Sequence, residues 1–420
     1  MRDETKCLHA GYTPKNGEPR VVPIVQSTTY VYDSTDEIAS VFDEPTKSLI
    51  YSRFANPTVM AVEEKIAALE GGVGAMCTSS GQAASLLSIL NLCNAGDSFL
   101  AAAEIYGGTV NLFTHTLKKL GIECIYIEKG MTDEEIDALF KPNTKAVFGE
   151  TIANPALTVL DIERYANIAH RHGVPLIVDN TFATPVLCKP FDFGADIVIH
   201  STTKYMDGHA VQGGGIIVDS GKFDWTNGNF PDFTEPDVTY HGISYTETYD
   251  KAAYIIKARM QLMRDFGAYP AAHSAFLLNL GLETLALRME RYCENALKVA
   301  KYFEQSDKIE SVTYPGLESD ENHALAEKYL KGSSGVISIV IKGGRDNAVK
   351  FMDSLKLASN EVHVADIRTC VLHPASETHR QLSDEQLVLA GIEPGMVRFS
   401  VGLENVDDII EDIEQALANI

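Results

Sequence analysis

Short apolar runs alternate with amphipathic segments along the first two hundred residues. The apolar runs carry hydrophobic side chains at consecutive positions, which is typical of strands buried on both faces of a parallel sheet. The segments between them repeat apolar residues at helical spacing, as Val59, Val62, Ile66 and Leu69 do. This alternation predicts an α/β sheet with crossover helices. The expected strands are 73–77, 98–102, 122–127, 146–149, 175–178 and 197–200, and the expected helices are 57–70, 82–93, 109–120, 132–140 and 161–172.

Two other segments carry less pattern. Residues 1–57 hold several prolines and show little periodicity, which predicts an extended N-terminal arm. Residues 221–250 are acidic and rich in aromatic side chains. Because a loop this long in a compact domain is usually functional, it is either a wall or lid over a site or a surface excursion that packs its aromatics on the core.

Helix and strand patterns return beyond residue 270 but alternate less regularly. We expect a long helix over 271–305 that breaks near Gly281. The later elements are expected as strands at 336–341 and 396–401 and as helices at 346–355 and from Val406 onward. The chain therefore divides into an N-terminal arm (1–57), a large α/β domain (58–270) and a smaller α+β domain (271–420).

Charge and composition disfavour several classes of protein. The 420 residues include 58 acidic and 35 basic side chains, a net charge of -23, which argues against nucleic acid and anionic membranes as partners. No apolar run reaches the roughly 18 residues that span a bilayer, and the start lacks the apolar region of a signal peptide, so we expect a cytoplasmic protein. Seven cysteines without C-x-x-C and twelve histidines without H-E-x-x-H predict neither a disulfide framework nor a metal site.

Polar residues that could carry chemistry follow the predicted strands. In open α/β sheets, ligands bind beyond the carboxyl ends of the strands. Residues 78–82 place small side chains at a helix N-terminus, where backbone N–H groups and the helix dipole can hold a phosphate, although an ordinary Ser-capped helix has the same sequence. Asp179 ends an apolar strand, so it is either an anion facing a cationic ring nitrogen or a turn residue.

Two further segments lie in the same layer. Lys204 follows a buried strand and the hydroxyls of 201–203. A lysine desolvated there has the lowered pKa of a Schiff-base nucleophile, although most lysines are solvated. Tyr106 precedes Gly107 and Gly108, which would let its ring lie flat over a ligand, unless it is a core tyrosine. A phosphate cradle, a stacking ring, a carboxylate and a Schiff-base lysine are together what pyridoxal 5′-phosphate (PLP) requires.

A series of motifs in one order resembles a known family. The motifs are Tyr51-Ser52-Arg53, Asn56-Pro57-Thr58, Ser79-Ser80-Gly81, Tyr106–Thr109, Asn154-Pro155, Val178–Phe182, Ser201–Tyr205, His373–Ser376 and Arg398–Gly402. Over nearly its whole length the chain is similar to the Cys/Met-metabolism PLP-dependent enzymes of fold type I, the cystathionine γ-synthase and methionine γ-lyase group. The resemblance implies the fold of these transferases: a mostly parallel sheet flanked by helices, an N-terminal arm and a smaller C-terminal α+β domain.

The resemblance also implies roles for particular residues. Lys204 would carry PLP as a Schiff base and act with Tyr106 in catalysis, while Asp179 would pair with the ring nitrogen. The remaining cofactor contacts would come from Ser80, Gly81, Gln82, Asn154, Ser201 and Thr203, and from Tyr51 and Arg53 of a neighbouring subunit. The substrate would be held by Arg398, Asn154 and His363. The family also implies a homotetramer built from two catalytic dimers.

Within the family, the sequence is most similar to the O-acetylhomoserine sulfhydrylases (aminocarboxypropyltransferases). The likeness rests on 234–237, 240–242 and 373–376 together with Thr378 and His379. It implies γ-replacement on O-acetyl-L-homoserine with sulfide or methanethiol, giving L-homocysteine or L-methionine plus acetate.

One motif departs from the family pattern. Relatives often have Ser or Asn before a Gly-Asp pair, whereas this chain has His363-Val364-Ala365-Asp366. His363 would then supply the second contact to the substrate carboxylate, by backbone or side chain, or make only a structural hydrogen bond.

Other activities remain open from the sequence. A methionine γ-lyase or a cystathionine γ-synthase would share these motifs, although Gly108 stands where the γ-lyases have cysteine. A nicotinamide-dependent Rossmann enzyme is suggested only by Gly71–Gly74, which precedes a strand instead of following one. A non-catalytic regulator on the same scaffold would not need the lysine, aspartate and arginine set.

Overall fold

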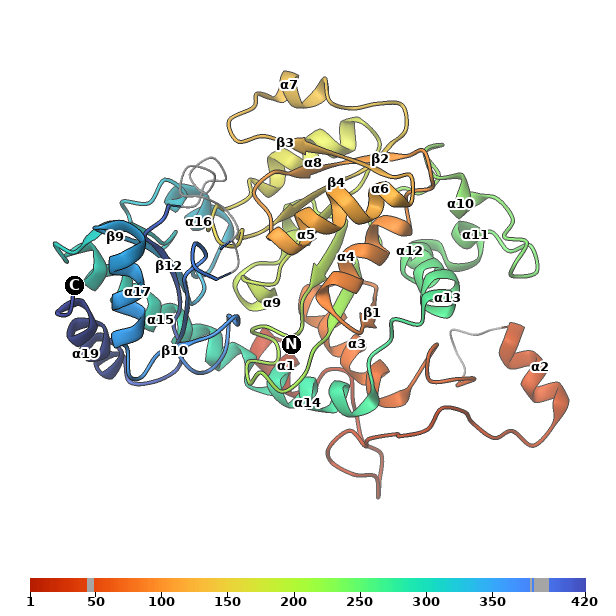
Figure 1. Ribbon diagram of the computed structural model, residues 1–420. Helices are drawn as coiled ribbons and strands as arrows, with labels where there is room; N and C mark the ends of the chain where they lie inside the picture. Colours follow the sequence, from red (N-terminus) through yellow and green to blue (C-terminus); the bar gives the residue numbers. More distant parts are fainter. Residues whose placement is uncertain (44–48, 378–379, 381–392) are drawn as a thin grey trace.

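Two β-sheets, which lie in successive parts of the chain, organise the fold (Figure 1). The computed structural model describes residues 1–43, 49–377, 380 and 393–420. The larger sheet has seven strands in the order β1-β7-β6-β5-β4-β2-β3. These strands are β1 (Gly74–Thr78), β2 (Ser98–Ala102), β3 (Glu123–Ile127), β4 (Thr144–Glu150), β5 (Leu176–Asp179), β6 (Ile197–His200) and β7 (Gly215–Asp219).

Most strands of the larger sheet run parallel, as the sequence predicts. β3, β2, β4, β5 and β6 pair in parallel, whereas β7 runs antiparallel to its neighbours β6 and β1. Every residue of β2, β6 and β7 is buried, as expected for strands covered on both faces. The predicted α/β class is confirmed. The carboxyl ends of β1, β4, β5 and β6 therefore meet at one edge.

Strand β7 is the main element that the sequence pattern does not predict. Glycines at 213–215 lead into it and suggest a loop. Gly215 is required by packing, because a Cβ at this position would lie 2.3 Å from the main-chain oxygen of Ser80. Because Gly215 has no side chain, β7 can join the sheet while lying directly against Ser80, in the loop that precedes helix α4 (Gly81–Leu90).

The helices around this sheet begin and end where local sequence favours it. Helix α3 (Pro57–Glu70) starts at Asn56, whose side chain accepts a hydrogen bond from the Thr58 N–H (3.1 Å), and it ends at Gly71 with φ of 85°. The predicted helix 109–120 is interrupted by a π-helical turn at Leu112–Thr116, between α5 (Gly107–Asn111) and α6 (Leu117–Lys119). The other helices are α4 (Gly81–Leu90), α7 (Asp133–Asp137), α8 (Ile162–Arg171), α9 (Thr184–Leu187), α10 (Pro231–Thr234), α11 (Tyr245–Tyr249), α12 (Ala253–Lys257) and α13 (Arg264–Phe266).

The N-terminal region contains two helices where the sequence predicts extended chain. Helix α1 (Asp3–His9) packs on the body of the protein, since Cys7 is buried and its main-chain oxygen accepts a hydrogen bond from Lys65 Nζ (2.9 Å). Helix α2 (Thr35–Asp43) lies away from the body, at the lower right of Figure 1, and exposes Ile38 and Phe42. The expectation of an extended stretch is wrong for these two helices.

The aromatic part of the 221–250 segment packs onto the body of the protein. Trp225, Phe230 and Phe233 are buried, and the Trp225 ring stacks on those of Phe233 (4.6 Å between centroids) and Tyr254 (5.3 Å). This arrangement fits the interpretation of 221–250 as a surface excursion that packs its aromatic side chains on the core, and not the interpretation as a wall or lid over a site.

The C-terminal part of the chain builds the second sheet, in the order β10-β11-β12-β9-β8. Gly281 does not mark the helix break, which falls at Thr284; a Cβ at Gly281 would lie 2.5 Å from the Met206 main-chain oxygen, so this glycine permits close packing. The elements are α14 (Ala272–Glu283), α15 (Leu285–Glu304), β8 (Ile309–Thr313), α16 (His323–Tyr329), β9 (Val336–Ile341), α17 (Gly344–Ser354), β10 (Ser359–Asn360), β11 (Cys370–Leu372), β12 (Met396–Ser400) and α19 (Val406–Leu417).

Two expectations from composition can be compared with the fold. All seven cysteines are free and five are buried, which confirms that they serve mainly as small core residues. Among the helices that the structure describes, none combines the length and the apolar character needed to cross a membrane.

Candidate active site

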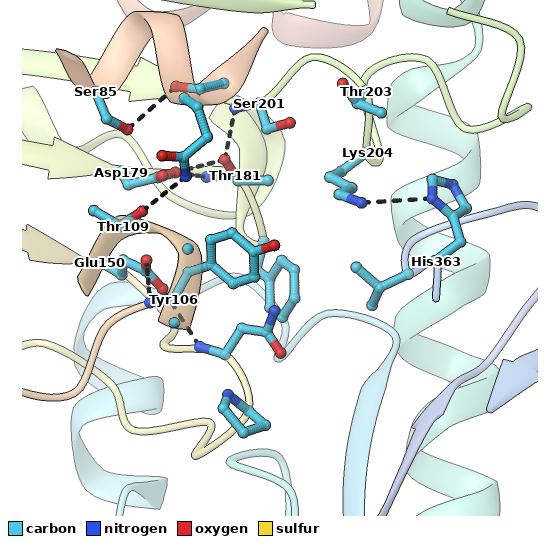
Figure 2. Close-up of a pocket in the computed structure, with 18 of the residues that line it drawn as sticks. Ser85, Tyr106, Thr109, Glu150, Asp179, Thr181, Ser201, Thr203, Lys204 and His363 are labelled. Atoms are coloured by element: carbon cyan, nitrogen blue, oxygen red, sulfur yellow. Dashed lines mark hydrogen bonds between the residues drawn. The ribbon is translucent and has the colours of Figure 1, made fainter. Parts of the chain in front are cut away.

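A cavity of about 570 Å³ opens where the carboxyl ends of β4, β5 and β6 face residues of the C-terminal part of the chain. This volume lies in the range of small-molecule sites. The cavity is lined by nearly all of the site residues predicted from the sequence: Ser80, Gly81, Gln82, Tyr106, Asn154, Asp179, Ser201, Thr203, Lys204, His363 and Arg398. Figure 2 shows side chains such as Asp179 and Lys204, which come from the part of the chain that builds the larger sheet, together with His363 from the C-terminal part.

One side of the cavity is formed by the N-terminus of α4. The Ser80 hydroxyl caps this helix by accepting a hydrogen bond from the Ala83 N–H (3.1 Å). Gly81 packs against Ser201 so closely that a Cβ at position 81 would lie 2.6 Å from the Ser201 Cβ. The glycine therefore lets two hydroxyl-bearing segments meet beside the free N–H groups of a helix terminus, which suits an anion such as phosphate.

Further hydrogen bonds hold the side chains beside this terminus. The Thr203 hydroxyl donates to the Gly214 main-chain oxygen (3.2 Å) and accepts from the Gly214 N–H (3.0 Å). The Gln82 side-chain amide donates to the Thr109 hydroxyl (3.3 Å). These bonds fix the polar groups before any ligand arrives.

Asp179 lies at the floor of the cavity, at the end of β5. Burial raises the pKa of its carboxyl group, and hydrogen bonds from the hydroxyl and the N–H of Thr181 oppose that rise. His200, which ends the neighbouring strand β6, also opposes it electrostatically. Two donors and a nearby histidine thus favour the anionic form of a carboxyl group that burial alone would neutralise.

Sequence reasoning missed Glu150, which lies beside Asp179 in the sheet. The two residues are paired in the register of β4 and β5. Glu150 accepts hydrogen bonds from the N–H groups of Tyr106 (2.7 Å) and Asn154 (3.4 Å). Burial, followed by the negative charge of Asp179, raises the pKa of Glu150 well above its usual value. Of the two carboxyl groups, we therefore assign a proton to Glu150 and the negative charge to Asp179.

The Tyr106 ring projects into the cavity and is about half exposed (48%). Its position depends on Gly108, because a Cβ at 108 would lie 2.5 Å from the Tyr106 Cε1 atom. The absence of a side chain at Gly108 thus makes room for the tyrosine ring.

Lys204 follows β6 and is largely enclosed. Burial, and then the positive charge of Arg398, lower the pKa of the Lys204 amine to about 8. Its Nζ lies 3.5 Å from Nδ1 of His363 (Figure 2). A lowered pKa in an enclosed site makes an amine a nucleophile near neutral pH.

Arg398, on β12, links the two sheets. Its guanidinium donates to the Asn154 side-chain oxygen (3.1 Å) and to the His363 main-chain oxygen (2.8 Å). The Nε atom is buried and has no hydrogen-bond partner among the described residues. A guanidinium on the wall of a cavity suits a carboxylate ligand.

Tyr51 and Arg53 do not line this cavity. The Arg53 guanidinium lies over the Tyr51 ring, 5.2 Å from its centroid, and Arg53 borders a separate small hollow. Within one chain, the structure therefore does not bring these two residues to the site. Of the sulfhydrylase-like positions in the sequence, Thr378 and His379 lie outside the described residues.

The donor set of the cavity fits PLP. The helix terminus beside Gly81 matches the phosphate, the buried anion at Asp179 matches a protonated ring nitrogen, and the Lys204 amine matches the aldehyde. The close approach of Gly81 to Ser201, which a side chain would block, is the detail most specific to an anion cradle.

Comparison with known proteins supports this assignment. The O-acetyl-L-homoserine sulfhydrylase of Leptospira meyeri is 44% identical, over 100% of this chain and 97% of its own. The homocysteine synthase of Schizosaccharomyces pombe is 46% identical, over 99% and 97%. A crystal structure of a putative O-acetylhomoserine (thiol)-lyase from Campylobacter jejuni matches all of both chains with a TM-score of 0.95 and 36% identity, and it carries N′-pyridoxyl-lysine-5′-monophosphate.

A model of one enzyme family also covers almost the entire sequence. The family is described as Cys/Met metabolism PLP-dependent enzyme, and its model matches residues 4–418. The match extends through both sheets and includes every residue that lines the cavity. The chain belongs to the Cys/Met-metabolism family of PLP-dependent enzymes.

Proposed function

We propose that this enzyme replaces the acetate of O-acetyl-L-homoserine with sulfide or methanethiol, forming L-homocysteine or L-methionine. The observation that carries the proposal is the convergence of Lys204, Asp179 and Arg398 on one cavity beside the α4 terminus. Relatives named O-acetyl-L-homoserine sulfhydrylase or homocysteine synthase, at 44% to 46% identity over nearly full length, support the choice of substrate. Gly108 favours replacement over the γ-lyase alternative, because the family resemblance places a cysteine at this position in the γ-lyases.

In this proposal Arg398 binds the α-carboxylate of the amino-acid ester. Its contacts with Asn154 and the His363 main-chain oxygen orient the guanidinium plane at the wall of the cavity. Asn154 then lies within reach of both cofactor and substrate. His363 contributes to carboxylate binding through its main-chain oxygen, which holds Arg398, while its imidazole points to Lys204.

The proposed chemistry divides between the cofactor and the chain. PLP supplies, when bound, an electrophilic carbon for the substrate amine and a ring that accepts the electron pair released at Cα. Asp179 keeps the ring nitrogen protonated. The Lys204 amine, with a pKa near 8, is partly unprotonated at neutral pH and takes the Cα proton. Tyr106 stacks on the ring and shields that proton transfer from water.

We also propose an assembly in which neighbouring subunits complete each other's sites. Tyr51 and Arg53 lie outside the cavity of their own chain, which is compatible with a role at the cofactor phosphate of a neighbour. In this proposal, residues 1–57 form the reaching arm, 58–270 bind the cofactor and 271–420 complete the substrate site. We further propose a cytoplasmic homotetramer of two catalytic dimers.

Product analysis tests the proposed reaction. The purified enzyme, loaded with PLP, is incubated with the O-acetyl, O-succinyl or O-phospho ester of homoserine and with sulfide, methanethiol or cysteine. We expect homocysteine from the acetyl ester and sulfide, detected by mass spectrometry. Absence of product from the acetyl ester would overturn the substrate assignment, cystathionine formed with cysteine would indicate a γ-synthase, and ammonia and an oxoacid released from methionine would indicate a lyase. Lys204→Ala should abolish both turnover and the visible absorbance of the Schiff base between PLP and the lysine.

A further inference from the structure

His363 stands between the Lys204 amine and a buried carboxylate. Its Nδ1 atom lies 3.5 Å from Lys204 Nζ, and its Nε2 atom lies 4.0 Å from Asp366 Oδ2. Nε2 is buried and has no hydrogen-bond partner among the described residues. Asp366 is held in turn by Arg368, whose Nε and Nη2 donate to its two carboxylate oxygens at 2.9 and 3.1 Å.

We propose that Asp366, His363 and Lys204 form a proton relay, in which the His363 imidazole accepts the proton that the Lys204 amine takes from the substrate. The proposal rests on the proposed function, because it assigns Lys204 to proton abstraction. The arrangement places a reactive group, a base 3.5 Å from it and a carboxylate 4.0 Å beyond that base in one series. The His363 imidazole can accept a proton near neutral pH, which a hydroxyl or an amide side chain cannot do.

The proposed reaction includes two successive deprotonations, and the relay would make Lys204 available for the second one. Replacement at Cγ requires loss of a proton first from Cα and then from Cβ. When the Cα–H bond breaks, its proton joins the lone pair of Lys204 Nζ, and the electron pair stays with the substrate and the ring. The resulting ammonium cannot take a second proton. Transfer of one proton from Nζ to His363 Nδ1 restores the neutral amine and leaves an imidazolium that faces the Asp366 carboxylate, so the Cβ proton can follow.

The surroundings of His363 favour a neutral, accepting imidazole. Burial, and then the positive charge of Lys204, lower the pKa of His363, while the carboxylates of Asp366, Glu361 and Asp207 oppose that shift. Arg398 and Cys370 contact the His363 main-chain oxygen. Because the imidazole is a weaker base than the amine, the proton stays on it only briefly and returns or moves on to solvent.

Proton exchange in D2O separates the two deprotonation steps. The PLP-loaded enzyme is given L-norvaline, which has no leaving group, and deuterium uptake at Cα and Cβ is followed by proton NMR. In His363→Asn, the side-chain oxygen can still hold the amine but cannot accept its proton. We expect Cβ exchange to fall by about 10²-fold, the lower end of general acid–base contributions, and Cα exchange to change much less. His273→Asn, at an exposed position on α14, is the matched control.

The ratio of the two exchange rates decides the proposal. A ratio equal to that of wild type, whether both rates fall or neither does, would overturn the relay. Cofactor content and visible absorbance show whether His363→Asn still binds PLP. If wild type makes no homocysteine but its Cβ exchange still depends on His363, the proposed substrate is wrong while the relay stands.

A second measurement is independent of turnover. The full-length protein, stripped of cofactor, is treated with diethyl pyrocarbonate at a series of pH values, and modification of His363 is quantified by peptide mass spectrometry. Since the Lys204 charge lowers the pKa of His363, Lys204→Ala should shift half-maximal modification to higher pH, while exposed His273 should not shift. An unchanged midpoint for His363 would show that the two groups are not coupled, and the relay would be rejected.

Discussion

Replacing Glu150 with glutamine tests whether Glu150 keeps its proton in the folded protein because it is buried beside the Asp179 carboxylate. Glu150 is buried beside Asp179, and burial followed by the Asp179 charge raises its pKa well above the ordinary value of 4.5. The folded chain therefore keeps a proton at Glu150 that the unfolded chain releases above about pH 4.5. A group whose pKa is raised by folding stabilises the fold fully below its unfolded pKa, and this contribution is lost as the pH rises toward its folded pKa.

The expected effect of Glu150→Gln changes with pH. Above pH 4.5 the free energy of unfolding of wild type should fall, relative to the variant, by up to about 1.4 kcal/mol per pH unit. The substitution also destabilises the variant. The NH2 group of glutamine cannot accept a hydrogen bond, so the bond from the N–H of Tyr106 or of Asn154 is lost, which costs about 0.5–1.5 kcal/mol. The variant should thus be no more stable than wild type near pH 5 and should gain on it as the pH rises to 7.

Urea unfolding of the full-length, cofactor-free protein between pH 5 and pH 8 measures this difference. Glu64→Gln, at an exposed position of α3, is the control and should leave the pH dependence of wild type unchanged. If the stability of Glu150→Gln followed that of wild type in parallel across this range, Glu150 would carry no extra proton in the folded protein, and the division of charge between the two carboxyl groups would be wrong.

The remaining predictions concern the cavity. Asp179→Asn should bind PLP, seen by its visible absorbance, but slow Cα-proton abstraction severely; near-normal turnover would exclude the ring-nitrogen pairing. Arg398→Lys cannot keep both contacts of 3.1 and 2.8 Å, so KM for the amino-acid ester should rise at least about tenfold, as expected for a lost charged hydrogen bond of about 1.5–3 kcal/mol, with the cofactor spectrum unchanged. Gly108→Ala should displace the Tyr106 ring, since the new Cβ would lie 2.5 Å from it, and so lower kcat and alter the circular dichroism of the bound cofactor; an unaltered spectrum would contradict the steric argument.

The candidate site residues of the larger sheet are predictable from sequence because they lie at or shortly after the ends of strands. Ser80, Asp179 and Lys204 each come just after or at the end of an apolar run, and parallel strands bring their carboxyl ends to one edge. Local order along the chain is then enough to place them around one ligand, without knowledge of how distant segments pack.

Features that depend on distant packing escape such reasoning. Glu150 is missed because the apolar run that predicts β4 stops at Gly149, one residue before the strand ends. The position of Arg398 comes from family resemblance alone, since no local pattern tells which way a strand of the second sheet faces. Strand β7 is hidden by its leading glycines, whose purpose is visible only when Ser80 lies against Gly215.

The bridge from Arg398 to Asn154 has a consequence for how this enzyme can diversify. The residues assigned to the cofactor lie on or beside the larger sheet, whereas the cation assigned to the amino acid comes from the second sheet, on a strand more than 190 positions beyond Lys204. Mutations in the second sheet can therefore change which amino acid binds without altering the residues assigned to the cofactor. New substrate specificities can then arise while the type of reaction stays the same.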